Sequence, residues 1–173
     1  MANTYDLIAS SIVGSGGATS IDFTSIPATY TDLLLKVSVR QDSSDTAKAI
    51  VFRLNNDSGS NYSARMIYGT GSGAASASTT TTSIFYWYSS DAGATASTFN
   101  NAEVYIPDYT SSNQKSLSFD SVSENNGTLA YANLTAGLWT DTSAINRITL
   151  TPYTGATNFV QYSTAYLYGI KKN

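Results

Sequence analysis

The side chains that most often perform acid–base, nucleophilic or metal chemistry are scarce in this sequence. The chain has no His and no Cys, which removes the commonest general base, the thiol nucleophile and the usual ligands of zinc, copper and haem. Its 12 acidic and 9 basic residues give a formal net charge of −3. The chemistry that these residue types still permit rests on carboxylates and hydroxyls.

A pair of carboxylates on opposite sides of a sugar can hydrolyse a glycosidic bond. Nothing in the spacing of the acidic residues marks such a pair, and an exposed or turn position is the simpler interpretation for most of them. The acidic residues that a β-sandwich could bring together for this purpose are Asp22, Glu103, Asp108, Asp120 and Glu124.

Two further groups of residues give weaker evidence of a chemical role. Asn55, Asp57, Ser58 and Asn61 alternate oxygen-bearing side chains as a calcium loop does, but the later Glu of an EF-hand is absent, so we favour a structural turn. The Gly-Ser-Gly sequence at 71–73 is not a nucleophile elbow, and no His exists to act as its base. We therefore expect no enzymatic activity, no cofactor and no metal site.

Aromatic side chains are the better candidates for binding. The sequence has 13 Tyr, 6 Phe and 2 Trp among many Ser and Thr, and rings surrounded by hydroxyls and amides suit both sugar and protein contacts. Burial in the core is the competing interpretation for each ring. The candidate contact residues are Tyr86, Trp87, Tyr88, Trp139, Tyr153 and Tyr162.

These residues must be positioned by β-structure, because β-branched and aromatic residues are abundant and no segment shows the apolar period of a helix. The clearest strand is 33–40, in which Leu33, Leu35, Val37 and Val39 share one face. We expect about eleven strands in total. Their ranges are 5–13, 19–24, 33–40, 50–54, 62–68, 82–88, 102–107, 115–123, 128–134, 145–151 and 158–170.

The connections have distinct compositions. Segment 55–61 is rich in Asn, Asp, Ser and Gly, which predicts a hairpin loop. Segments 69–81 and 89–97 consist mainly of small and polar residues and are expected to be long connections. Between them, 84–88 is apolar on both faces, and we favour an interior strand over an aromatic strip on the surface.

Short strands separated by Gly, Asn, Asp and Ser predict an all-β fold, a two-sheet antiparallel sandwich of jelly-roll type, with an up-and-down barrel as the alternative. The 173 residues show no internal repeat and no linker, so we expect one domain over 1–173. The small net charge argues against a nucleic-acid partner. Without a long apolar stretch or a basic leader, we expect neither membrane insertion nor a signal peptide.

Two distinctive segments stand near the start of the chain, YDLIAS at 5–10 and SIDFTSIPATYTDL at 20–33. They resemble segments of virion proteins of tailed bacteriophages that infect aquatic bacteria, and the resemblance covers most of the chain. Further similar segments are FRLN at 52–55, NYS at 61–63, VYIPDY at 104–109 and QYSTAYLYGI at 161–170. None of these motifs is catalytic, and we expect departures from the group in 69–97.

The resemblance implies a non-enzymatic, sandwich-type component of the virion. Our leading hypothesis is a capsid decoration or cement protein on the outer head surface, bound to the major capsid protein or another virion protein as a homo-oligomer such as a trimer. Tyr-rich strands and the N-terminal segment are the expected attachment elements. The alternative is a tail-fibre or head-fibre domain that recognises cell-surface carbohydrate of the host.

Overall fold

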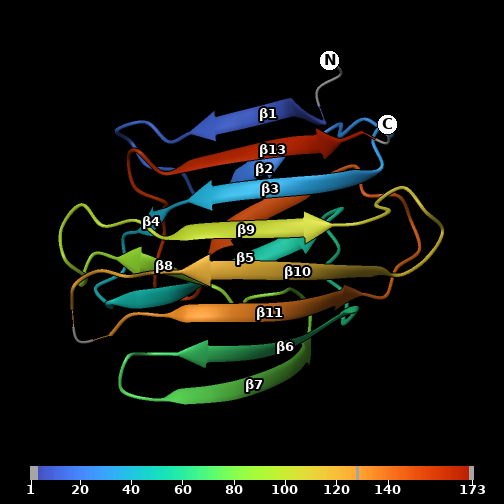
Figure 1. Ribbon diagram of the computed structural model, residues 1–173. Coiled ribbons are helices and arrows are strands. Elements are labelled where there is room, and N and C mark those ends of the chain that lie inside the picture. The colour runs from blue at the N-terminus through green and yellow to red at the C-terminus, as the bar shows by residue number, and fades with distance from the viewer. Residues whose placement is uncertain (1–3, 128, 172–173) are drawn as a thin grey trace.

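Alternating apolar and polar residues fold this chain into thirteen β-strands, with no helix among the residues that the structure describes, 4–127 and 129–171. In the computed structural model the strands form two sheets that enclose one core (Figure 1). The predicted all-β, two-sheet fold is therefore confirmed. Within the same ranges no helix is long and apolar enough to cross a membrane.

The larger sheet has eight strands, each antiparallel to its neighbours. In spatial order they are β1 (Tyr5–Ile12), β13 (Thr164–Ile170), β3 (Asp32–Ser38), β9 (Asn101–Ile106), β10 (Lys115–Val122), β11 (Ala132–Trp139), β6 (Tyr62–Gly69) and β7 (Ala74–Thr81). The smaller sheet runs β2 (Ile21–Phe23), β12 (Ile148–Pro152), β5 (Ala47–Leu54), β8 (Tyr88–Asp91) and β4 (Arg40–Gln41). Among the described strands, β4 and β8 alone are parallel, a departure from the predicted antiparallel arrangement.

The core is built from the inner faces of both sheets. Leu33 and Leu35 point inward from β3, as their alternation predicts, and both are fully buried. Phe52 of β5 makes edge-to-face contacts with Trp87 and Phe119, at centroid distances of 6.3 and 5.2 Å. Because Phe119 belongs to β10 of the larger sheet, this aromatic cluster joins the two layers.

Most predicted strands lie near their expected positions, but segment 82–88 is not a strand. Ile84 makes only an isolated bridge with Phe52, and β8 begins at Tyr88. The interior interpretation holds for Ile84 and Trp87, which are buried. The strand predicted over 128–134 starts at residue 128, outside the described residues, and the observed strand there is β11.

Segment 69–81, predicted to be a long connection, contains β7. All eight of its residues pair with β6 in an uninterrupted register, although none of them is buried. The backbone ladder with β6 therefore outweighs a composition of small and polar residues that suggests a loop.

The prediction of a hairpin loop at 55–61 is wrong. The segment joins β5 of the smaller sheet to β6 of the larger one, so the chain crosses between the layers. Asn55 and Asn56 adopt positive φ angles of 51° and 56°, a conformation that Asn tolerates better than most residues. Two successive left-handed residues turn the backbone out of the smaller sheet, and local composition alone does not distinguish this path from a hairpin.

Gly169 in β13 lies directly against the ring of Tyr30, which packs on the core, and a Cβ at this position would overlap the ring. We expect Gly169→Ala to lower the free energy of unfolding by about 1–3 kcal/mol, the usual cost of overpacking. Urea denaturation measures this loss. Gly14→Ala is the control, because nothing lies within 4 Å of a Cβ there. Equal losses in the two variants would contradict the packing explanation.

Candidate functional site

The outward face of the larger sheet carries most of the exposed large apolar side chains. Among the described residues eight such side chains are exposed, and Tyr162 lies in a loop. Because most strands of this sheet already pack one face on the core, apolar residues on the other face indicate a contact surface. The strand register places seven of the eight on this outward face, namely Tyr5, Leu7, Ile12, Ile67, Tyr105, Val122 and Leu134.

One group of these side chains lies toward β1. Leu7 is opposite Tyr168 of β13, and Tyr168 is opposite Leu34 of β3. Leu34 in turn lies opposite Tyr105 of β9, so a row of apolar and aromatic side chains crosses four strands. The Tyr105 hydroxyl donates a hydrogen bond to the Asp32 carboxylate at 2.8 Å, and this bond raises the pKa of Tyr105.

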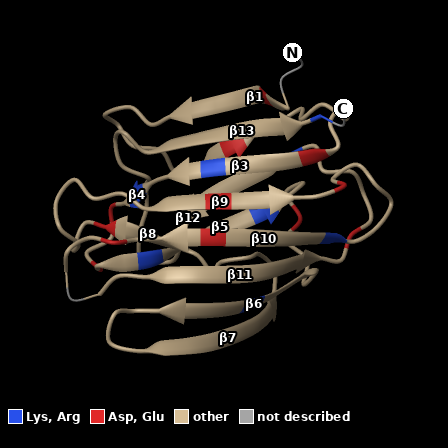
Figure 2. Cartoon of the chain, in the orientation of Figure 1, with Lys and Arg blue, Asp and Glu red and all other residues tan. Residues whose placement is uncertain are grey.

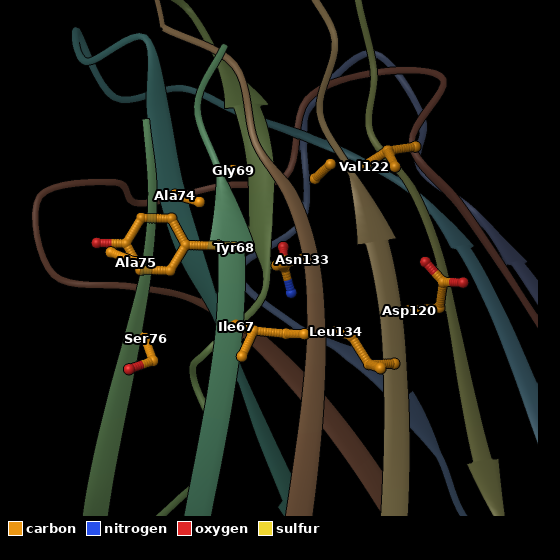
Figure 3. A pocket seen from close by; sticks show the side chains of 11 residues that line it. Ile67, Tyr68, Gly69, Ala74, Ala75, Ser76, Asp120, Val122, Asn133 and Leu134 are labelled. Atoms are coloured by element: carbon orange, nitrogen blue, oxygen red, sulfur yellow. The ribbon is translucent and has the colours of Figure 1, made fainter. Parts of the chain in front are cut away.

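The second group lies toward β7. Ile67 of β6 and Leu134 of β11 are directly opposite each other, and their exposed fractions are 61% and 52%. With Val122 of β10 and small residues of β7 they line an open depression of about 680 Å³ (Figure 3). The floor of this depression is a continuous sheet, so the feature is a shallow apolar patch rather than a deep cavity.

A charged stripe separates the two apolar groups. Lys36 of β3 lies opposite Glu103 of β9 and forms an ion pair with it, and Glu103 lies opposite Asp120 of β10. Figure 2 shows a basic position on β3 beside acidic positions on β9 and β10, across the middle of the sheet. Because the side chains of the ion pair are about half exposed, 52% and 44%, the pair adds little to stability. Charges in such a position are suited to fixing the orientation of a bound protein rather than to stabilising the fold.

The register brings two of the candidate catalytic carboxylates together, Glu103 and Asp120. They stand on neighbouring strands, so both would lie on the same side of a sugar placed on the sheet. Glycoside hydrolysis needs carboxyl groups on opposite sides of the scissile bond. Asp22 is on the smaller sheet, and Asp108 and Glu124 lie in connecting segments.

Two of the six predicted contact residues, Trp87 and Trp139, are core residues. Trp87 packs against Phe52 and Phe119, and Trp139 stacks on Tyr62. Both tryptophans are fully buried, which corrects the prediction that they contribute to an exposed contact surface. The physical reason is that a large ring removes the most apolar area from water when it lies between the sheets.

The other four predicted residues are accessible but do not converge on one surface. Tyr86 and Tyr153 both pack on Phe85, at centroid distances of 5.1 and 5.3 Å. Tyr88 stacks on another tyrosine at 4.2 Å. Tyr162 is 70% exposed in the loop before β13. Of these four tyrosines, only Tyr86 and Tyr153 share a neighbour, because both pack on the ring of Phe85.

Sequence reasoning missed Ile67 and Leu134 as contact residues. For Ile67 a signal existed, because the alternation of 62–68 assigns an apolar residue to the otherwise polar side of the strand. Leu134 offered no such signal, since the predicted strand ended at this residue whereas β11 continues to Trp139.

Comparison with known proteins assigns this chain to no family. No protein-family model matches the chain, and no curated protein matches it either. The likeness of several segments to phage virion proteins therefore remains a resemblance. The function has to be argued from the geometry of the surface itself.

The connection 55–61, considered above as a calcium loop, uses its carboxylate internally. Asp57 Oδ2 accepts hydrogen bonds from Trp139 Nε1 at 2.7 Å and Asn61 Nδ2 at 2.9 Å, and Oδ1 accepts one from the Gly59 amide at 2.8 Å. Burial alone would raise the pKa of Asp57, but these bonds outweigh it and lower the pKa. In the described part of the chain, no cluster of three or more His, Cys, Asp or Glu could hold a metal.

Asp57→Ala is expected to lower the free energy of unfolding by about 1–3 kcal/mol, because it leaves the indole N–H of Trp139 without its acceptor. Urea denaturation followed by Trp fluorescence measures the loss, with the exposed Asp120→Ala as the control. Since hydrogen bonds hold the turn, calcium and EDTA should leave the melting temperature of the wild type unchanged. A rise in melting temperature with calcium would instead favour the calcium-loop interpretation.

Proposed function

We propose that this chain is a non-enzymatic structural protein of a phage particle, a decoration protein that attaches to the head shell through the outward face of its larger sheet. The observation that carries the proposal is the gathering of seven exposed large apolar side chains on that one face. The segments that resemble virion proteins of tailed phages support a place in the virion.

The pattern on this face suits a broad protein surface better than a small ligand. Two apolar groups flank the charged stripe of Lys36, Glu103 and Asp120. A partner that covered both groups would bury an area typical of stable protein interfaces. The stripe would then fix the orientation of the two proteins, because charges that fail to meet opposite charges oppose binding.

A head shell presents the same partner surface many times at fixed spacing. Each copy of a decoration protein, and each protomer of an oligomer, can then engage an identical site, so modest individual contacts are multiplied by avidity. A rigid sandwich helps here, because the contact residues are held in place before binding and little conformational entropy is lost.

A second function, glycan recognition by a fibre domain, is favoured by one specific groove. Phe85 and Tyr153 line it together with Arg53 and several Thr residues, and its volume is about 370 Å³. The two rings are tilted 37° to each other at 5.3 Å. Aromatic rings beside hydroxyls and a guanidinium are suitable for stacking on and hydrogen bonding to a sugar.

The proposal is tested with heads of the phage that encodes this chain, prepared without the protein and mixed with purified variants. Ile67→Ser combined with Leu134→Ser should raise the Kd for the heads by about tenfold or more, which corresponds to about 1.4 kcal/mol. Both side chains are more than half exposed, so the stability of the free protein should change little. Co-sedimentation with the heads measures the bound fraction.

Val51→Ser is the matched control, because Val51 lies on a strand of the smaller sheet and lines the groove of Phe85 and Tyr153. It should leave head binding intact. If wild-type protein does not bind heads, the decoration function is wrong. If Val51→Ser abolishes attachment to host cells while the Ile67 and Leu134 variant does not, the glycan-binding function replaces it. A reconstruction of the intact particle gives the position of the protein directly.

A further inference from the structure

The larger sheet ends at β7, and no strand in the described part of the chain pairs with its free side (Figure 1). The eight residues of β7 have the sequence AASASTTT, and none is buried. One side of its backbone therefore presents N–H and C=O groups to solvent, apart from the Ser78 carbonyl, which accepts a hydrogen bond from the Tyr86 hydroxyl at 3.1 Å. Such an edge is a template for pairing with another strand.

The other three sheet edges carry features that discourage pairing. The edge strands β2 and β4 have only three and two residues. The register of β1 shifts between Leu7 and Ala9, and its Asp6 forms an ion pair with Lys171. By contrast, β7 has no charged residue, no Pro and no register shift. Short length, charge and bulges are the usual protections of an edge, and β7 has none of them.

We propose that β7 pairs with the β7 of a second copy of this chain, antiparallel, about a twofold axis perpendicular to the sheet. This addition continues the antiparallel order of the larger sheet across the dimer. In every register the opposed side chains of the two strands are Ala, Ser or Thr, so these side chains do not collide. Where the second strand donates to the Ser78 carbonyl, the Tyr86 hydroxyl has to release it. Like charges directly opposite each other destabilise a strand pair, and β7 has no charged residue that could meet its copy in this way.

The free edge of β7 is a better match for β7 of a second copy than for β1, the other long edge strand of the larger sheet. The register shift in β1 bends that strand and increases its twist, whereas β7 is an uninterrupted eight-residue ladder. If β7 of one copy paired with β1 of the next, the contact would repeat head to tail and form rings or filaments. The contact between two β7 strands has twofold symmetry and closes after two copies. The twofold contact places the depressions around Ile67 and Leu134 of both copies on the same side of one joined sheet.

An edge contact of eight residues buries less area than most stable interfaces, so we expect a weak dimer, with a Kd on the order of 10–100 µM. The inference does not depend on what the outward face binds. A dimer with two coplanar outward faces would gain avidity on a repeated surface, but the pairing itself is measured on the isolated protein.

Sedimentation equilibrium of the purified protein from about 1 µM to about 1 mM tests the inference, over a range that spans the expected Kd. The wild type should pass from monomer to dimer. Ser76→Glu combined with Ser78→Glu places charge on two exposed positions of β7 and should weaken dimerisation by about tenfold or more. The control is Ser116→Glu with Ser118→Glu, which makes the same charge change at exposed outward positions of β10 and should leave the dimer intact.

Amide hydrogen exchange supplies a second measurement. Amides within 74–81 should exchange more slowly as the wild-type concentration rises, while those of β1 should not change. A monomer over the whole range, species larger than a dimer, equal weakening in both double variants, or protection confined to β1 would each overturn the inference. Circular dichroism of the variants verifies that any loss of the dimer is not a loss of fold.

Discussion

The unequal width of the two sheets is the constraint on which the rest of this structure depends. A five-stranded layer cannot cover both the length and the breadth of an eight-stranded one, so the larger sheet keeps a strand that buries none of its residues. Central strands such as β10 bury every second side chain, and their position is set by the core. At β7 the ladder with β6 and one hydrogen bond from the Tyr86 hydroxyl hold the strand, and the residues left in water are Ala, Ser and Thr, which lose little by being exposed.

The interior explains how such a broad face can remain rigid. Phe52, Trp87 and Phe119 lock the layers together through edge-to-face contacts, and the connection from β5 to β6 is fastened by the hydrogen bond from Trp139 to Asp57. Both tryptophans therefore act in the fold. The outward side chains belong to strands whose inward side chains are close-packed in the core, namely β3, β6, β9, β10 and β11. Because close-packed side chains cannot move independently, the apolar groups and the charged stripe keep a fixed arrangement.

Sequence alone was sufficient where a strand alternates strictly. The pattern of 115–123 predicts a strand, and the observed strand buries Leu117 and Phe119 while exposing Ser116, Ser118 and Asp120. It was insufficient where the composition of a segment resembles a loop, because β7 is a strand only through its ladder with β6 and 55–61 crosses between layers for reasons that lie outside the segment. The burial of Trp139 is a related case. Its aromatic type suggests a contact role, but the side of the strand decides exposure, and that side is known only when the register is known.

The order of strands in the larger sheet also has a consequence for folding on the ribosome. The hairpin β6–β7 and the consecutive strands β9, β10 and β11 join neighbours in the sequence, so these pairs close short loops and can form early. Strand β1 instead pairs with β13, and β13 with β3, contacts that wait until residues 164–170 have been synthesised. Until then Leu33 and Leu35 have no β13 beside them, and the nascent chain is expected to depend on chaperones that shield apolar segments.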